Sequence, residues 1–136
     1  MKVHKFGGSA LSGTESFEQM ARILKACSED LVVVSAFSGV TDELLGAANL
    51  AASRNGYAGV LEGLYDRHLR LATHFLEGRE LDAARSALRA ELDRLGELLG
   101  GVAVLQDLSH RSLDQILSVG ELLSAPLVTR ILNAKG

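Results

Sequence analysis

The residues of this sequence whose types and order could do chemistry lie close to its N-terminus. Lys5 is followed by two adjacent glycines, Gly7 and Gly8, and then by the hydroxyl of Ser9. Glycines let backbone N–H groups approach an anion, a following helix adds a favourable dipole, and a lysine adds a positive charge. This order is typical of a phosphate-binding turn, but also of a strand that ends in an ordinary glycine turn beside a solvated lysine. Neither common phosphate fingerprint, G-x-x-x-x-G-K-[ST] or G-x-G-x-x-G, is present.

A second group of polar residues follows the apolar run Leu31–Val34. Ser35 comes directly after the run, and Thr41 precedes the acidic pair Asp42 and Glu43. Thr41 is expected to cap a helix whose first turn contains both acids, because a capping hydroxyl and negative charge each stabilise a helix N-terminus. A threonine at the end of a strand would also face the crevice where α/β proteins bind ligands, so the two roles are compatible.

A third candidate is Glu121, in the stretch Ser118-Val119-Gly120-Glu121 of an apolar helical pattern. A glycine inside a helix costs about 1 kcal/mol relative to alanine, so Gly120 predicts close approach by another group. A carboxylate beside that contact could face a binding site. It could equally be an ordinary solvated acid of a helix.

The elements that must position these residues begin with a strand and a helix. Val3 and Phe6 indicate a short buried strand. Ser16 and Gln19 form a capping-box pattern, with serine at the N-cap of the helix that follows. One face of this helix is apolar at helical spacing, and its members are Phe17, Met20, Ala21, Leu24 and Cys27. Cys27 is interpreted as a small core residue of that face rather than as a nucleophile.

The run Leu31–Val34 is continuously apolar, which is typical of a strand buried on both faces. A strand, a helix and a second strand predict a βαβ unit with parallel strands. Both strands then end at the same edge of the sheet, where open α/β sheets bind ligands. The fold class expected is therefore α/β, with parallel strands and covering helices.

The rest of the chain predicts helices. Residues 57–100 contain two amphipathic patterns, expected to pack as a helical hairpin on the body or against a partner. The segment Val102–Leu105 is expected to be a short apolar turn or a weak strand. Ser109 or Ser112 should cap the next helix, and Pro126 should lie in the first turn of a last one.

Composition excludes several classes of function. A formal charge of −3 provides no basic surface, so nucleic acid is not expected as a partner. Cys27 is the only cysteine, and His68 and His74 are spaced to lie on different sides of a helix, so no metal site is expected. No apolar run approaches the length of a membrane helix and no signal peptide is recognised, so we expect no membrane partner and a cytoplasmic location.

Three stretches together resemble the aspartate kinases of the amino-acid kinase superfamily. They are Lys5-Phe6-Gly7-Gly8-Ser9, the segment 33–42 (Val-Val-Ser-Ala-Phe-Ser-Gly-Val-Thr-Asp), and the segment 118–124 (Ser-Val-Gly-Glu-Leu-Leu-Ser). The family's usual first motif is Lys-Phe-Gly-Gly-Thr-Ser-Val. Ser9 keeps the hydroxyl of the usual threonine, whereas Ala10 loses that of the serine.

The resemblance implies an activity and roles for particular residues. The implied reaction is ATP-dependent phosphorylation of the aspartate side-chain carboxylate to 4-phospho-aspartate, which opens the pathway to lysine, threonine and methionine. Lys5 would neutralise charge on the transferred phosphoryl group. Backbone N–H groups around Gly7, Gly8 and Ser9 would hold the phosphates of ATP, with Mg²⁺ bound to the nucleotide.

The resemblance also implies a binding site for the acceptor substrate. Thr41 and Glu121 match positions that bind aspartate, and Glu121 is suited to its ammonium group. Ser35 would line the same site with its hydroxyl. These groups agree with the physics of phosphoryl transfer, which depends on positioning and on charge stabilisation.

The family's kinase domain is longer than this chain. Residues 1–136 are therefore expected to be one domain, the N-terminal, substrate-side part of such a kinase, with residues 57–100 as a helical insertion. We expect this part to be inactive alone and to associate with copies of itself or with the rest of a kinase. The alternatives are a superfamily member acting on glutamate, acetylglutamate, carbamate or uridylate, and a non-catalytic helical assembly module.

Overall fold

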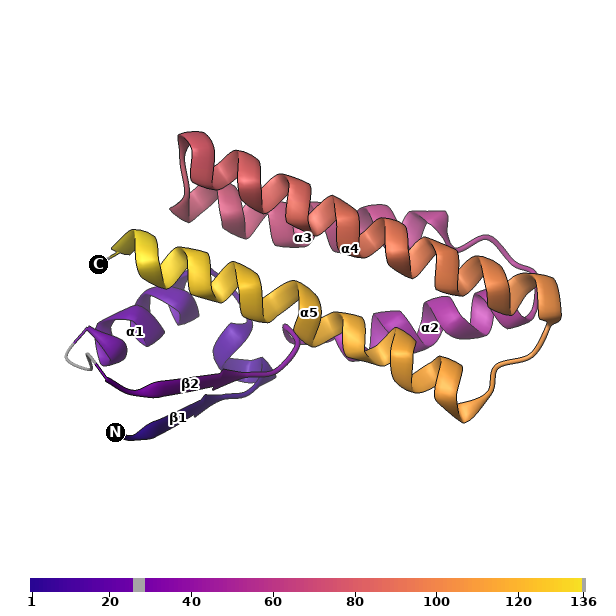
Figure 1. Ribbon diagram of the computed structural model, residues 1–136, viewed down its shortest axis with the longest axis horizontal. Helices are drawn as coiled ribbons and strands as arrows, with labels where there is room; N and C mark the ends of the chain where they lie inside the picture. Colours follow the sequence, from indigo (N-terminus) through magenta and orange to yellow (C-terminus); the bar gives the residue numbers. More distant parts are fainter. Residues whose placement is uncertain (26–28, 136) are drawn as a thin grey trace.

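Two short parallel strands lie along one side of a layer of helices in the computed structural model, which describes residues 1–25 and 29–135 (Figure 1). The expected α/β class is confirmed. In chain order the elements are β1 (Val3–Phe6), the 3₁₀ helix η1 (Gly8–Leu11), α1 (Thr14–Leu24), β2 (Leu31–Val34), α2 (Val40–Ala52), α3 (Ala58–Phe75), α4 (Gly78–Leu105) and α5 (His110–Lys135). The interpretation of Cys27 lies outside the described residues.

The strands pair in parallel, in a register that places Val3 beside Leu31 and Phe6 beside Val34. The expected βαβ arrangement is thus confirmed. The expectations that the first strand is buried and that the second is buried on both faces are wrong, because Val3, Leu31 and Val33 are 61%, 54% and 40% exposed. Side chains alternate between the two faces of a strand, and the described helices cover only the other face (Figure 1).

The first helix begins earlier than its capping-box pattern predicts. α1 starts at Thr14, with an extended Gly13 at its N-cap and no capping side chain. The Ser16 hydroxyl instead lies 3.1 Å from that of Ser12, so it is engaged outside the helix backbone. The apolar face of α1 is nevertheless as expected, since Phe17 and Met20 are buried.

Thr41 is not the N-cap of α2, contrary to expectation. That position is held by Gly39, whose φ of +80° lies in the left-handed region that glycine adopts without steric cost. Val40 then begins the helix with a fully buried side chain. Thr41 follows in the first turn, where it is exposed.

The predicted helical hairpin is present as α3 and α4, which lie side by side along their lengths (Figure 1). α4 also packs on α2 and α5, so the pair belongs to the body of the protein. The segment Val102–Leu105 is the last turn of α4, not a turn or strand. Gly100 and Gly101 lower helix propensity, but burial of Leu99 and Val102 on either side offsets that cost.

Two helices were expected in this region, with Pro126 in the first turn of the second. Instead, α5 is a single unbroken helix that contains Pro126. An interior proline costs about 3 kcal/mol, and here the apolar side chains on both sides of it are buried, which holds the helix together. The Ser109 hydroxyl accepts a hydrogen bond from the Ser112 N–H (3.1 Å), which confirms Ser109 as a cap.

α5 also departs from the expectation that no apolar stretch reaches the length of a membrane span. By length and composition, it is the one helix among residues 1–25 and 29–135 that could cross a membrane. Of its most apolar stretch, 44% is buried inside the protein.

At Gly120, α5 closely approaches the loop after β2 and the start of α2. A methyl group built at Gly120 would lie 2.7 Å from the Ala36 Cβ and 3.4 Å from the Leu44 Cδ1. Carbon atoms in van der Waals contact lie about 3.5–4.0 Å apart, so only glycine fits this position. The close approach expected from the sequence is confirmed.

His68 is a polar residue within the apolar core. Its ring stacks on Phe37 with centroids 4.6 Å apart, and Nδ1 donates a hydrogen bond to the Leu64 carbonyl at 2.7 Å. Nε2 is buried and has no hydrogen-bond partner among the described residues. Burial lowers the pKa of His68 from 6.5 to about 4, so the ring is neutral at pH 7.

We expect Gly120→Ala to lower the free energy of unfolding by about 1–3 kcal/mol, because Ala36 would have to move away from the added methyl group. Gly46→Ala is the matched control, since Gly46 lies inside α2 with open space where its methyl would stand. That change should raise stability by up to about 1 kcal/mol. Urea unfolding measures both, and a Gly120→Ala protein as stable as wild type would contradict the tight contact.

The buried His68 should also make stability depend on pH. The unfolded chain takes up a proton near pH 6.5, whereas the folded chain resists it until about pH 4, so acid favours unfolding in this range. His68 should therefore cost about 3 kcal/mol of stability as the pH falls through this range. The test compares urea unfolding of wild type and His68→Phe at several pH values; identical slopes for both proteins would refute the assignment.

Candidate functional site

The two strands end side by side, and the residues that follow them touch. The Ser35 N–H donates to the Phe6 carbonyl (3.2 Å), which extends the strand pairing by one residue. Beyond it, a methyl group at Gly8 would lie 3.5 Å from the Ser38 Cα and 3.6 Å from the Ala36 oxygen. The glycine turn after β1 and the loop after β2 therefore form one surface at the carboxyl edge of the sheet.

The middle of α5 is hydrogen-bonded to the same edge. The Ser124 hydroxyl donates to the Ser35 carbonyl at 2.8 Å, across a long separation in sequence. One turn earlier, Gly120 stands against Ala36. Glu121, the next residue, is exposed beside this contact. Because small and hydroxylated residues form the contact surface, α5 approaches the loop after β2 closely at this point.

The first turn of α2 meets α5 at the same point. Val40 packs against Gly120, with its Cγ1 3.6 Å from where a Gly120 methyl would be. Thr41 directly follows Val40, and Glu121 directly follows Gly120. Both Thr41 and Glu121 are exposed. The structure thus brings the neighbourhoods of Thr41, Glu121 and Ser35 together, although the Ser35 hydroxyl itself donates to the adjacent Ala36 carbonyl (3.3 Å).

Lys5 occupies a different position from the other predicted site residues. It alternates with Phe6 along β1 and so lies on the exposed face of the sheet, with Val3 and Val33. In the described part of the chain, no hydrogen bond or ion pair joins its ammonium group to Thr41 or Glu121. The structure therefore places Lys5 near the end of β1, on the face of the sheet that the described helices do not cover.

The glycine turn leaves room for a ligand. A methyl group built at Gly7 would meet no atom within 4 Å, so open space adjoins this backbone. Gly8 begins η1, and Ser9 lies in its first turn. The first N–H groups of a helix have no acceptor within the helix, so those of Gly8 and Ser9 can donate to a bound group.

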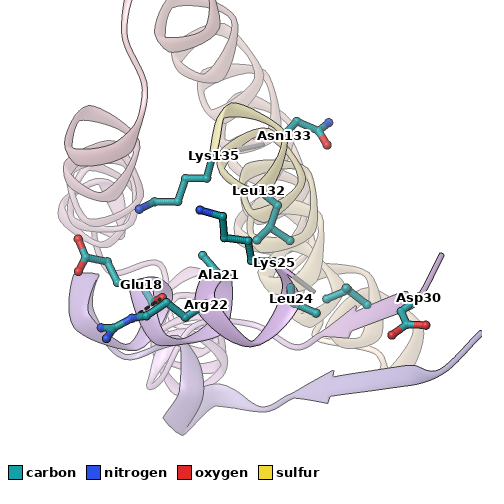
Figure 2. Close-up of a pocket in the computed structure, with 10 residues that line it drawn as sticks. Glu18, Ala21, Arg22, Leu24, Lys25, Asp30, Leu132, Asn133 and Lys135 are labelled. Atoms are coloured by element: carbon teal, nitrogen blue, oxygen red, sulfur yellow. Dashed lines mark hydrogen bonds between the residues drawn. The ribbon is translucent and has the colours of Figure 1, made fainter. Parts of the chain in front are cut away.

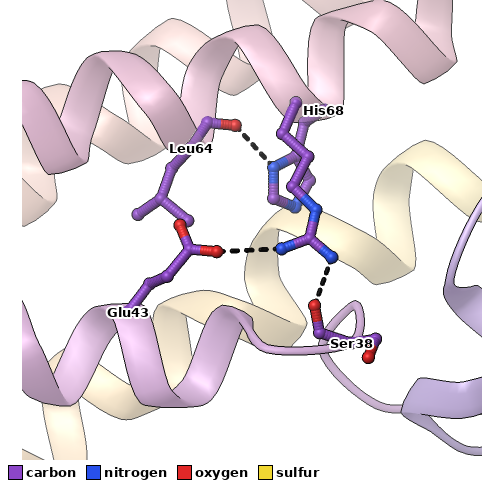
Figure 3. A network of polar contacts seen from close by, with 5 residues as sticks. Ser38, Glu43, Leu64 and His68 are labelled. Atoms are coloured by element: carbon purple, nitrogen blue, oxygen red, sulfur yellow. Dashed lines mark hydrogen bonds and ion pairs between the residues drawn. The ribbon is translucent and has the colours of Figure 1, made fainter.

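Arg67 of α3 is part of this edge, although no sequence pattern pointed to it as a site residue. Its Nη1 donates to Glu43 Oε1 at 2.9 Å, and its Nη2 donates to the Ser38 carbonyl (Figure 3). The only signal in the sequence was its place beside His68 on a helix with an apolar face. That pattern indicates that Arg67 borders the core, but not which loop it reaches.

An open cavity of about 520 Å³ lies away from this edge, beside Asp30 at the amino end of β2 (Figure 2). The ammonium groups of Lys25 and Lys135 both point into it. None of the residues predicted to bind substrate or phosphate lines this cavity. Within residues 1–25 and 29–135, no three His, Cys, Asp or Glu side chains gather in a way that could hold a metal ion.

Comparison with known proteins identifies the family of this chain. The sequence model of the amino acid kinase family matches residues 1–136. The chain is 34% identical to the bifunctional aspartokinase/homoserine dehydrogenase 1 of Zea mays and 32% identical to aspartokinase 3 of Arabidopsis thaliana, over 98% of its length in both cases. It spans only 15% and 24% of those two proteins. The names of both relatives describe them as chloroplastic. The similarity therefore does not support the cytoplasmic location expected for this chain, which stays a prediction.

The fold is shared with a solved aspartokinase. The chain superposes on aspartokinase III of E. coli, in its complex with aspartate and ADP, with a TM-score of 0.83. The match covers 99% of this chain and 29% of that one, at 23% identity, which establishes a common fold. Because the family model covers every residue and the structure has the fold of an aspartokinase, this chain belongs to the amino acid kinase family.

Proposed function

We propose that this chain forms the substrate-side part of an aspartokinase, which transfers the γ-phosphoryl group of ATP to the side-chain carboxylate of aspartate. One observation carries the proposal. The three segments that resemble the aspartate kinases are held together at a single edge of the sheet by the contacts of Gly8 with Ser38 and of Gly120 with Ala36. The relatives named as aspartokinases support the choice of aspartate within the family.

The phosphate side of the proposed site is the turn after β1. Open space beside Gly7 and the free N–H groups at the start of η1 suit the phosphate oxygens of ATP. Lys5, at the end of β1, would supply positive charge to the transferred phosphoryl group. Mg²⁺ would reach the site with the nucleotide, where it would neutralise charge on the phosphates.

The acceptor side of the proposed site is the loop after β2 together with α5. Glu121 would hold the ammonium group of aspartate, and the exposed Thr41 hydroxyl would donate to one of its carboxylates. The Ser35 hydroxyl would have to rotate away from the Ala36 carbonyl to reach the substrate. Phosphoryl transfer needs little covalent chemistry from the protein, so these positioning contacts are the contribution expected of this part.

Catalysis is proposed to need residues outside these 136. The chain spans 15–29% of the aspartokinases described above. The apolar side chains of Val3, Leu31 and Val33 are exposed on one face of the sheet, which another part of a kinase or a second copy of this chain would cover. Residues 1–136 would then be one domain with 57–100 as its helical insertion, able to bind but not to turn over substrate.

The same exposed face also supports a second candidate function. A helical assembly module derived from the kinase fold would use the apolar surface around Val3, Leu31 and Val33 to associate, without binding substrate. Such a module would be indifferent to changes at Glu121 or Lys5. The two candidates therefore differ in ligand binding, not in association.

Calorimetric titration of aspartate and of Mg-ATP into the chain tests the proposal. Glu121→Gln should weaken aspartate binding about tenfold or more, because it removes the charge that faces the ammonium group. Lys5→Ala should weaken Mg-ATP binding and leave aspartate binding nearly unchanged. Glu77→Gln, in the exposed turn between α3 and α4, and Lys2→Ala, near the start of β1, are the matched controls and should change neither affinity.

Two results would overturn the proposal. If the folded wild-type chain bound neither ligand but associated with rising concentration, the assembly module would be the better account. If aspartate bound equally well to wild type and Glu121→Gln, the assigned acceptor side would be wrong.

A further inference from the structure

The segment 38–43 runs from the loop after β2 through the first turn of α2 and contains Thr41. Consecutive residues of α3, Arg67 and His68, contact this segment or the Phe37 that precedes it. We infer that Arg67 and His68 clamp this segment and thereby position Thr41 for the acceptor substrate. The helical hairpin would then be a positioning element of the site and not only a structural insertion. This inference rests on the function proposed above, and its test is designed to separate the two.

Arg67 holds both ends of the segment at once. One guanidinium nitrogen donates to the Glu43 carboxylate at 2.9 Å, and the other donates to the Ser38 carbonyl (Figure 3). Thr41 lies between these two anchor points in sequence. Because the guanidinium is a planar, rigid fork, it fixes the distance between the loop and the helix more firmly than two independent contacts would.

His68 holds the segment from the core side. Its ring stacks on Phe37, directly before the segment, with an interplanar angle of 15°. The hydrogen bond from Nδ1 to the Leu64 carbonyl sets the orientation of the ring within α3. Phe37 also meets Phe17 of α1 edge to face at 5.4 Å, so it is trapped between two helices. The segment is therefore fixed on its solvent side by Arg67 and on its buried side by the stacked rings.

The backbone of the segment makes such a clamp necessary. Gly39, with φ of +80°, is the N-cap of α2, and no side chain caps the helix. Glycine restricts the backbone less than any other residue, so this turn has little stiffness of its own. The Arg67 guanidinium lies 3.8 Å from where a Gly39 methyl would stand, close enough to confine the turn.

Arg67 is better suited to positioning than to binding substrate directly. Two of its nitrogens are occupied by the protein's own oxygens, and the Glu43 carboxylate compensates its charge. Its side chain is 34% exposed, so solvent partly screens the charge interaction with Glu43. Its effect on aspartate would pass through the placement of Thr41.

The test measures two properties of Arg67→Gln in the whole chain. Calorimetry should show aspartate binding weakened about fivefold, which corresponds to the loss of one partly exposed charged contact. Hydrogen exchange should be faster at the Val40 and Glu43 amides, which donate to the Phe37 and Gly39 carbonyls. Arg70→Gln is the matched control, because Arg70 is exposed one turn later on α3 and should change neither property.

Further variants separate positioning from general loss of structure. Arg67→Lys keeps the charge and should restore part of the affinity, while Glu43→Gln combined with Arg67→Gln should weaken binding no more than Arg67→Gln alone. The clamp is refuted if Arg67→Gln binds aspartate as wild type does, or if Arg70→Gln has the same effect. If wild type does not bind aspartate, the proposed function fails, and unchanged exchange at Val40 and Glu43 in Arg67→Gln would then refute the clamp separately.

Discussion

The contact between Gly120 and Ala36 is the constraint on which the rest of the candidate site depends. Space for a single methyl group decides how closely α5 approaches the loop after β2, and the only residue that leaves this space is glycine. This approach lets the Ser124 hydroxyl reach the Ser35 carbonyl, which fastens the helix to the carboxyl edge of the sheet. Without it, Glu121 would lie farther from the loop after β2, and the proposed acceptor side would not be held together.

The glycine turn after β1, the middle of α5 and α3 all meet the loop after β2 at this edge. Each is held there by a different kind of interaction. Backbone pairing of β1 with β2 brings the glycine turn to the loop, steric fit at Gly120 brings α5, and the Arg67 fork brings α3. These elements surround the turn at Gly39, whose backbone glycine restricts little. Such a design suits phosphoryl transfer, in which the protein mainly positions reactants and stabilises charge.

The sequence predicted what local patterns determine, namely the parallel strands, the helical hairpin and the close approach at Gly120. It failed where packing overrode local preference. Pro126 and the glycines near the end of α4 mark breaks by propensity, yet buried neighbours keep both helices continuous. Thr41 has the chemistry of a cap, but the left-handed Gly39 takes that position. Arg67 could not be identified, because helical periodicity does not show which loop a helix faces.

The most direct test of the central claim is an NMR titration of the isotope-labelled chain with aspartate, following every backbone amide. The account predicts that the largest shifts fall in Ser35–Glu43 and around Gly120–Ser124, with smaller changes in Gly7–Ser9. Shifts centred instead on the cavity lined by Arg22, Lys25 and Lys135 would contradict it, as would a spectrum that aspartate leaves unchanged.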